Sequence, residues 1–297
     1  MTGAEKGFLL LSSHLGNPER KPLTTAQLRT LADRMRSAPR FPEDRDLEIR
    51  DLTALGYGRD VAQRILALLD EEELLEYYLS KGLRQGCIPI TRVSEGYPVI
   101  LRQRLGLDSP GCLWVKGDQS ILNTPAISLV GSRDLHPENR EFAETVGREA
   151  AMQGLTLVSG NARGADKAAQ EACLKAGGRV ISIVADSLAD HKERRNVLYV
   201  SEENYEAEFS AQRALSRNRC IHALGRMVFV AQSGLQQGGT WDGTVKNLRF
   251  GWSTVACFRD GSEASVQLEQ MGAYLIGMED LKDFGTLPES EECLFTR

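Results

Sequence analysis

Three short segments of the sequence combine glycine with a hydroxyl or a guanidinium group, a combination that suits a phosphate. They are Gly131-Ser132-Arg133, the run SGNARGAD at 159–166, and GLQQGGT at 234–240. Glycine lets an anion approach the backbone, and the unpaired N–H groups at the start of a following helix then point at it. Hydroxyls add donors, and arginine holds phosphate oxygens with two hydrogen bonds. Phosphate therefore fits these segments better than a neutral ligand does.

Asp166 is the residue of these segments that opposes a phosphate, because like charges repel. We interpret it as a cap or first-turn residue of the helix that follows, where a carboxylate is favourable. A pairing with Arg163 would then fix the direction of that guanidinium. Contact with a ribose hydroxyl is the alternative role.

The sequence offers little support for catalysis. No C-x-x-C pair, Walker A sequence or G-x-G-x-x-G fingerprint occurs, and Ser159 is not inside G-x-S-x-G. The histidines and cysteines have no spacing typical of a metal site; they are His14, His136, His191, His222, Cys87, Cys112, Cys173, Cys220, Cys257 and Cys293. We therefore expect no cofactor, no metal and no enzymatic turnover.

Positive charge is local rather than general. The formal net charge is −5, which argues against a chain that binds nucleic acid over its whole surface. The window 211–226 nevertheless carries Arg213, Arg217, Arg219 and Arg226 with no acidic residue. Such a window is commonly a solvated face, and it indicates a binding site only together with neighbouring features.

The elements that would position these residues alternate along the second part of the chain. Apolar runs typical of buried strands are expected at 127–131, 155–160, 179–185, 226–231, 253–258 and 273–276. Helices are expected at about 137–153 and 164–176, the second with a stripe of small residues that lets it lie close to its sheet. The pattern predicts a doubly wound, mainly parallel α/β sheet. The three segments would follow the carboxyl ends of strands, where ligands bind in such folds.

The first part of the chain reads as helical. Helices are expected at 23–35 and 60–83, and the segment 39–46 (RFPEDRD preceded by Pro39) reads as a linker. The run LGYGRDVAQRIL at 55–66 has the pattern of a helix-hairpin-helix, which can hold a DNA phosphate on backbone amides. A tight turn between packed helices explains the same run. We predict a helical domain at 1–85 and an α/β domain at 86–297.

The chain is expected to be cytoplasmic. The apolar run FLLL at 8–11 is shorter than a signal sequence requires, and no run approaches the roughly 20 residues of a membrane helix. Unclustered cysteines favour a reducing compartment.

Three motifs resemble those of the DNA-processing protein A (DprA, also called Smf) family. Val130-Gly131-Ser132-Arg133 resembles the family's VGTR or VGSR, the 159–166 run resembles SGLARGID, and 216–221 (SRNRCI) resembles RRNRII. Weaker similarity lies at 96–98 with 113–117 and in the closing segment near 261–281, so that the resemblance spans roughly residues 50–285. The family's third loop, SGSL-x-TA, is replaced here at 237–244, and Ser216 stands where the family has arginine.

The resemblance implies a Rossmann-like domain that follows a small helical domain and binds single-stranded DNA in a positive pocket. It also implies a homodimer, a RecA-type recombinase as partner, and a role in recombination or DNA-mediated transformation. The family's C-terminal winged helix is not expected in this chain. The predicted phosphate-binding set is Gly131, Ser132, Arg133, Ser159, Gly160, Arg163, Gly164, Asp166, Arg217, Asn218, Arg219, Gly238, Gly239 and Thr240.

The third segment leaves a second hypothesis open. It also resembles the P-G-G-x-G-T-x-x-E loop of the LOG-type phosphoribohydrolases, which cleave the base from a nucleoside monophosphate. Here Gly243-Thr244 is followed by 245–247 (VKN) without a glutamate, and Asp242 has the wrong spacing. Because cleavage needs a carboxylate near the developing charge, a non-catalytic nucleotide sensor is a better alternative than a hydrolase. Trp241 could stack on a base in either case, or simply pack.

Overall fold

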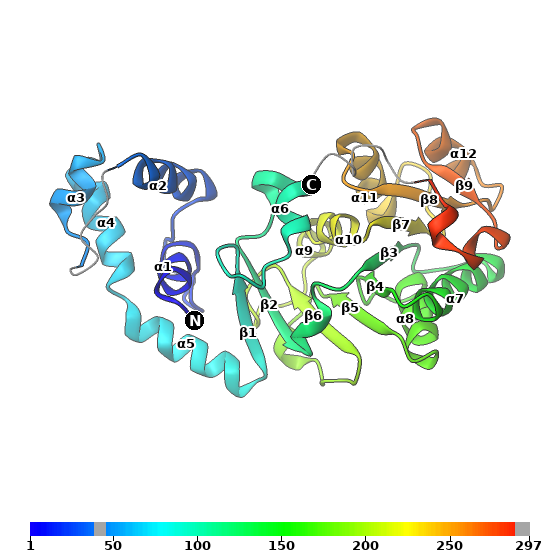
Figure 1. Cartoon of the computed structure of the whole chain (residues 1–297), viewed down its shortest axis with the longest axis horizontal. Helices are drawn as coiled ribbons and strands as arrows, with labels where there is room; N and C mark the ends of the chain where they lie inside the picture. Colours follow the sequence, from blue (N-terminus) through cyan, green and yellow to red (C-terminus); the bar gives the residue numbers. More distant parts are fainter. Residues whose placement is uncertain (39–45, 289–297) are drawn as a thin grey trace. The chain divides into compact units, whose positions relative to one another are not determined.

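The computed structural model describes residues 1–38 and 46–288 and forms two compact units, Met1–Tyr97 and Pro98–Arg297 (Figure 1). The predicted linker at 39–46 lies outside the described residues except for Asp46. No helix within the described ranges combines the length and the apolar character needed to cross a bilayer.

The first unit is helical and closes with one short strand. Its elements are α1 (Gly3–Ser12), α2 (Thr25–Ser37), α3 (Ile49–Ala54), α4 (Arg59–Leu69), α5 (Glu72–Arg84) and β1 (Cys87–Thr91). Thr2 and Thr24 begin α1 and α2 as capping boxes, in which the threonine accepts from the backbone three residues on and Glu5 or Gln27 reaches back. The helix predicted at 60–83 is interrupted, because α4 ends before Asp70 and α5 begins at Glu72.

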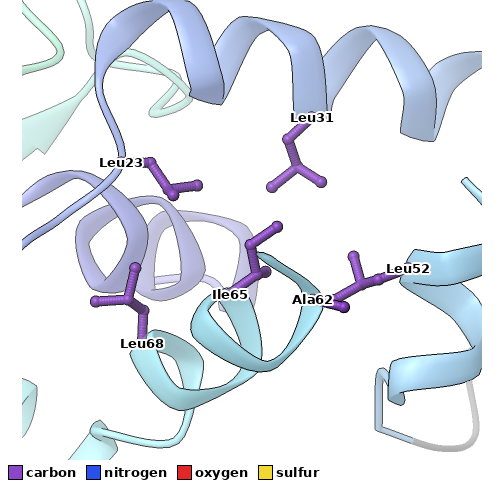
Figure 2. Close-up of a cluster of buried hydrophobic side chains, with 6 residues drawn as sticks. All are labelled: Leu23, Leu31, Leu52, Ala62, Ile65 and Leu68. Carbon is purple, nitrogen blue, oxygen red and sulfur yellow. The ribbon is translucent and has the colours of Figure 1, made fainter. Parts of the chain in front are cut away.

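The core of the first unit gathers apolar side chains from α2, α3, α4 and the segment before α2. Figure 2 shows them pointing toward one another; they are Leu23, Leu31, Leu52, Ala62, Ile65 and Leu68. Leu55 and Tyr57, from the turn of the predicted helix-hairpin-helix, pack against this cluster. The Arg34 guanidinium lies 4.3 Å from the centre of the Tyr57 ring and donates to the Leu55 carbonyl. The turn is thus anchored in the packing of the unit.

Arg20 closes the carboxyl ends of two helices in this unit. Its buried guanidinium donates to the carbonyls of Leu10, Ser13 and Leu68 and pairs with Glu71. A cation is favourable at the negative end of a helix, and here it also satisfies carbonyls that have no partner within their own helices.

The second unit is built on one sheet with the order β2-β6-β5-β4-β3-β7-β8-β9. The strands are β2 (Cys112–Gly117), β3 (Ala126–Val130), β4 (Thr156–Ser159), β5 (Arg179–Ile183), β6 (Val197–Ser201), β7 (Met227–Val230), β8 (Thr254–Phe258) and β9 (Tyr274–Ile276). All neighbours in this order are parallel except β2 and β6. The predicted strands are found, whereas β6 was not expected.

Helices cover both faces of this sheet (Figure 1). The helices of the unit are α6 (Val99–Leu105), α7 (Pro137–Met152), α8 (Ala165–Lys175), α9 (Ala211–Ser216), α10 (Asn218–Leu224), α11 (Gly238–Phe250) and α12 (Glu263–Gln270). From β3 the chain moves outward through β4 and β5, then returns and moves the other way through β7, β8 and β9. Right-handed crossovers place the two series of helices on opposite faces. The predicted doubly wound Rossmann-like fold, with a helical N-terminal part, is confirmed.

The small-residue stripe of α8 brings this helix into close contact with helix α7, whereas the sequence suggested a close approach to the sheet. Ala165, Ala168, Ala169 and Cys173 are buried, and a Cβ on Gly147 of α7 would lie 2.1 Å from the Ala169 carbonyl oxygen. The two helices are therefore in backbone contact, which fixes the start of α8 relative to the sheet.

Candidate phosphate-binding site

The three glycine segments lie side by side at the carboxyl edge of the sheet. They follow β4, β3 and β7, which are neighbours in that order. The Ser132 amide donates to the Gln232 carbonyl at 3.0 Å, and the Ala165 amide donates to the Ser132 carbonyl at 3.1 Å. The chain also reverses its direction of winding between β3 and β7, which is the position where ligands bind in open α/β sheets.

Gly164 joins the first two segments. Its φ of +90° and ψ of −124° are accessible to glycine and strained for other residues. A Cβ there would lie 2.4 Å from the carbonyl oxygens of both Ser132 and Arg133. Gly131 is similarly close to its neighbours, since its Cβ would lie 2.5 Å from that of Ala165. The segments therefore pack backbone against backbone.

Asp166 holds the second segment from within. It lies in the first turn of α8, as predicted, and is 6% exposed. Its Oδ2 accepts from the amides of Gly160 and Ala162, both at 3.1 Å. Burial raises the pKa of Asp166, and the nearby positive charge of Arg217 opposes that rise.

Two expectations for this segment are corrected. Arg163 pairs with Asp134 at 2.7 Å and not with Asp166, because the Asp166 carboxylate faces the interior. The amide of Gly160 does not face a ligand, because it donates to Asp166.

Ser159 does not offer its hydroxyl at the surface, which corrects the expectation that it donates to a phosphate. It is fully buried, and its Oγ accepts from Gln170 Nε2 at 2.6 Å. The position ends β4 with its side chain turned into the core, so it shapes the segment from beneath.

Exposed donors remain on the outer side of the edge. The side chains of Arg133 and Arg163 are exposed, and Ser132 is half-buried. Among the described residues the amide of the half-buried Asn161 donates no hydrogen bond. The pair that Arg163 forms with Asp134 is 74% and 86% exposed, so it adds little stability and leaves the guanidinium accessible.

Arg217 supplies positive charge beneath the second segment. It is 6% exposed, and its Nη1 lies 1.5 Å from the position that a Cβ on Gly160 would take. Its Nε and Nη1 are buried without a hydrogen-bond partner among the described residues. Burial lowers the pKa of Arg217, whereas the carboxylates of Asp166 and Glu202 raise it. A side chain larger than glycine at position 160 would therefore displace the Arg217 guanidinium.

Asn218 and Arg219 make their hydrogen bonds within the protein. Asn218 Nδ2 donates to the Gly239 carbonyl at 3.0 Å and so ties α10 to the third segment. Arg219 pairs with Glu202 at 3.0 Å and donates to the Asp108 carbonyl. These bonds fix the direction of both side chains.

The third segment ends at the start of α11. Gly238 and Gly239 open the helix, and Gln237 stands at its N-cap without a side-chain cap bond. Thr240 is half-buried, and its carbonyl accepts from the Thr244 hydroxyl. The helix start therefore keeps its amide end uncapped by any side chain, which favours an anion there.

Sequence reasoning missed the side chains that connect the segments. Gln232 accepts from the His136 amide at 2.9 Å and donates to the Asp134 carbonyl at 3.2 Å, so it joins the residues that follow the first segment to those that precede the third. Glu202 holds Arg219 from the end of β6. A polar residue directly after a buried strand was the available signal for Gln232. None marked Glu202, because β6 itself was not expected.

No group of three or more histidine, cysteine or carboxylate side chains within residues 1–38 and 46–288 is arranged to hold a metal ion. The chemistry of the site rests on hydrogen-bond donors and positive charge.

His222 links the site to the stability of the fold. Its Nδ1 lies 3.1 Å from Asn247 Nδ2 of α11, and Ser253 Oγ donates to its carbonyl. Burial lowers the pKa of His222 from 6.5 to about 3. The unfolded chain therefore binds one more proton between these values. The neutral imidazole of His222 contributes fully to the free energy of unfolding above pH 6.5. As the pH falls below this value, the contribution decreases by about 1.4 kcal/mol per pH unit.

We expect the free energy of unfolding to fall less steeply with acid in His222→Gln than in the unsubstituted chain, with a difference in slope of about 1.4 kcal/mol per unit between pH 6 and 4. Urea unfolding at several pH values measures this difference. His14→Gln is the matched control, because that side chain is exposed. Equal slopes in all three proteins would contradict a neutral buried imidazole.

The family model and the curated relatives agree on one family. The model of the family described as DNA recombination-mediator protein A matches residues 89–277. The DNA processing protein DprA of Bacillus subtilis (strain 168) is 30% identical over 233 residues, 73% of this chain and 75% of that protein. DprA of Streptococcus pneumoniae is 29% identical over 192 residues, 60% of this chain and 68% of its own length.

Solved structures show the same fold. The crystal structure of DprA from Streptococcus pneumoniae has a TM-score of 0.69 at 23% identity and covers 95% of this chain and 97% of its own. DprA from Helicobacter pylori has a TM-score of 0.54 at 22% identity, covering 67% of this chain and 93% of its own. The chain belongs to the DNA recombination-mediator protein A family.

Proposed function

We propose that this chain binds single-stranded DNA at the carboxyl edge of its sheet, holding the strand by its phosphates and catalysing no reaction. The observation that carries the proposal is the junction of the three glycine segments. Gly164 packs against the Ser132 and Arg133 carbonyls, and Ser132 bonds to Gln232. One edge therefore offers the donors of three loops to one ligand.

The charges of this edge favour a polyanion. Arg133 and Arg163 are exposed on its outer side, whereas Asp166 is buried and occupied by two amides. The start of α8 adds the positive end of a helix of 11 residues.

Relatives support a strand as the ligand. The curated relatives are DNA processing proteins, and the Helicobacter pylori structure was described for its mode of binding single-stranded DNA. Family membership also supports action with a RecA-type recombinase and assembly as a homodimer. Sedimentation equilibrium tests the homodimer, for which we expect twice the mass of the 32.8 kDa chain.

Salt dependence tests the proposed function. Fluorescence anisotropy with an unstructured 20-nucleotide DNA is expected to give an affinity that falls linearly in log salt. If each of the three segments holds one phosphate, these contacts contribute about −2 to the slope, because each phosphate contributes about −0.7 in single strands. A mononucleotide engages one phosphate and is expected to give about −0.7. Equal slopes for the two ligands would contradict the proposal.

A nucleotide sensor is the second candidate, favoured by the uncapped start of α11 with Trp241 beside it. In that case a mononucleotide binds and the 20-nucleotide DNA does not. Hydrolase activity is disfavoured, because Asp242 is paired with Lys246 at 2.8 Å. Release of free base from a nucleoside monophosphate would establish it.

A further inference from the structure

A pocket lies at the opposite edge of the sheet from the candidate site. It has a volume of about 590 Å³ and is lined by Leu174, Gly177, Arg194, Arg195 and Asn196. Gly177 precedes β5, and Asn196 precedes β6, so the pocket is at the amino ends of these two parallel strands. The glycine segments follow the carboxyl ends of their strands.

The turn that carries the two arginines is fixed by hydrogen bonds on both sides. The Val197 amide donates to the Arg194 carbonyl at 3.2 Å, and Asn196 has a φ of +62°, which closes the turn. Asn196 Nδ2 donates to the Gly177 carbonyl at 3.3 Å, and its own carbonyl accepts from Val180 at 2.8 Å. The backbone of the pocket is thus ordered without a ligand, so binding orders only side chains.

The two guanidinium groups are exposed and have no carboxylate partner anywhere in residues 1–38 and 46–288. This separates them from Arg213 and Arg219, which pair with Glu203 and Glu202. Adjacent guanidinium groups match the oxygens of phosphate, each with two parallel hydrogen bonds.

Helix α8 runs from the candidate site to this pocket. It begins directly after Gly164 and ends before Gly177, and its 11 residues span about 16 Å at 1.5 Å each. Lys167 near its start and Lys175 in its last turn are exposed, with Glu171 between them. A polymer with repeated phosphates can contact the candidate site and the pocket at the same time, whereas a small ligand cannot.

We propose that the Arg194–Arg195 pocket is a second phosphate site, which holds a further stretch of the single-stranded nucleic acid bound at the glycine segments. The inference rests on the proposed function, because the same strand is taken to reach both edges. An acidic peptide would suit two arginines as well, but the exposed lysines of α8 favour the continuous strand.

The test measures how tightly the double variant Arg194→Gln/Arg195→Gln binds a long and a short DNA, relative to the unsubstituted chain. We expect about 10-fold weaker binding of a 20-nucleotide DNA, and a salt slope shallower by about 1.4, since two phosphate contacts are lost. Binding of a trinucleotide, which is too short to span about 16 Å, is expected to be unchanged in calorimetry at low salt. Arg148→Gln/Lys282→Gln is the matched control, because it removes the same charge from exposed positions elsewhere.

The outcomes separate this inference from the proposed function. If Arg163→Ala weakens both ligands while the Arg194/Arg195 variant binds the 20-nucleotide DNA normally, the second site is wrong and the first stands. If neither DNA binds the unsubstituted chain, both are wrong. The second site would also be overturned if the matched control variant lost as much affinity for DNA. The same holds if the Arg194/Arg195 variant lost affinity for a polyglutamate peptide but not for DNA.

Discussion

Alanine at position 164 is expected to destabilise the fold by about 3 kcal/mol or more and to remove measurable binding of a 20-nucleotide DNA. Alanine is strained at a φ of +90°, at a cost of about 1–3 kcal/mol, and its Cβ would meet two carbonyl oxygens at 2.4 Å. These oxygens belong to Ser132 and Arg133. The first two segments must therefore separate, and the donors no longer converge. Urea unfolding and anisotropy on the folded protein measure the two effects.

Gly154→Ala is the matched control for this substitution. Gly154 has a φ of +71°, but no atom lies within 4 Å of the position of its Cβ. The variant should lose only about 1 kcal/mol and bind DNA normally, because strain is present without a collision. If Gly164→Ala behaved like Gly154→Ala, the contact between the first two segments would not be what assembles the site.

Removal of the Arg163 guanidinium is expected to weaken binding of the 20-nucleotide DNA about 10- to 100-fold, with little change in stability. A hydrogen bond to a charged group contributes roughly 1.5–3 kcal/mol, which corresponds to that range. The pair with Asp134 that is lost in the free protein is highly exposed and contributes little. Anisotropy with Arg163→Ala measures the affinity, and thermal unfolding measures the stability.

Asp134→Asn should have the opposite effect and tighten binding a few-fold. The carboxylate at Asp134 competes with phosphate for Arg163, and the neutral amide does not. Arg148→Ala, which removes an exposed guanidinium that donates to Thr145, is the control for charge alone. If Arg163→Ala bound the 20-nucleotide DNA with normal affinity, Arg163 would not belong to the site. The same conclusion would follow if Arg148→Ala weakened binding equally.

The architecture and the location of the site could be predicted because each depends on local rules. Apolar runs such as 127–131 can only be buried strands when helices separate them, and parallel strands bring the residues that follow them to one edge. Gly164 was selected because glycine lets an anion approach the backbone, whereas its positive φ and its contact with two carbonyls became visible only in the structure.

The partners of charged side chains could not be predicted in the same way. Arg163 lies three residues from Asp166 in sequence and pairs with Asp134 instead, because the start of α8 turns the Asp166 carboxylate inward. Arg217 belongs to a window that reads as a basic surface, yet it is buried over Gly160. Such choices depend on packing between elements distant in the chain.

Strand β6 was missed for a related reason. It follows β5 after a polar stretch that contains one short 3-10 turn (Leu188–Asp190) and no α-helix. The alternation of strand and helix, from which the other strands were predicted, is absent there. The break between α4 and α5 falls at Asp70 and Glu71, and Asp has a lower helix propensity than the leucines and glutamates around it.

The two amides that Asp166 already occupies have a consequence for how fast a ligand can be captured. Because Asp166 holds the backbone of the loop in shape, this backbone does not have to be reorganised when a strand arrives. Association should then be limited by diffusion and by the attraction between opposite charges, and the lifetime of the complex should carry the differences between ligands. Free and bound protein would share one backbone conformation at this edge.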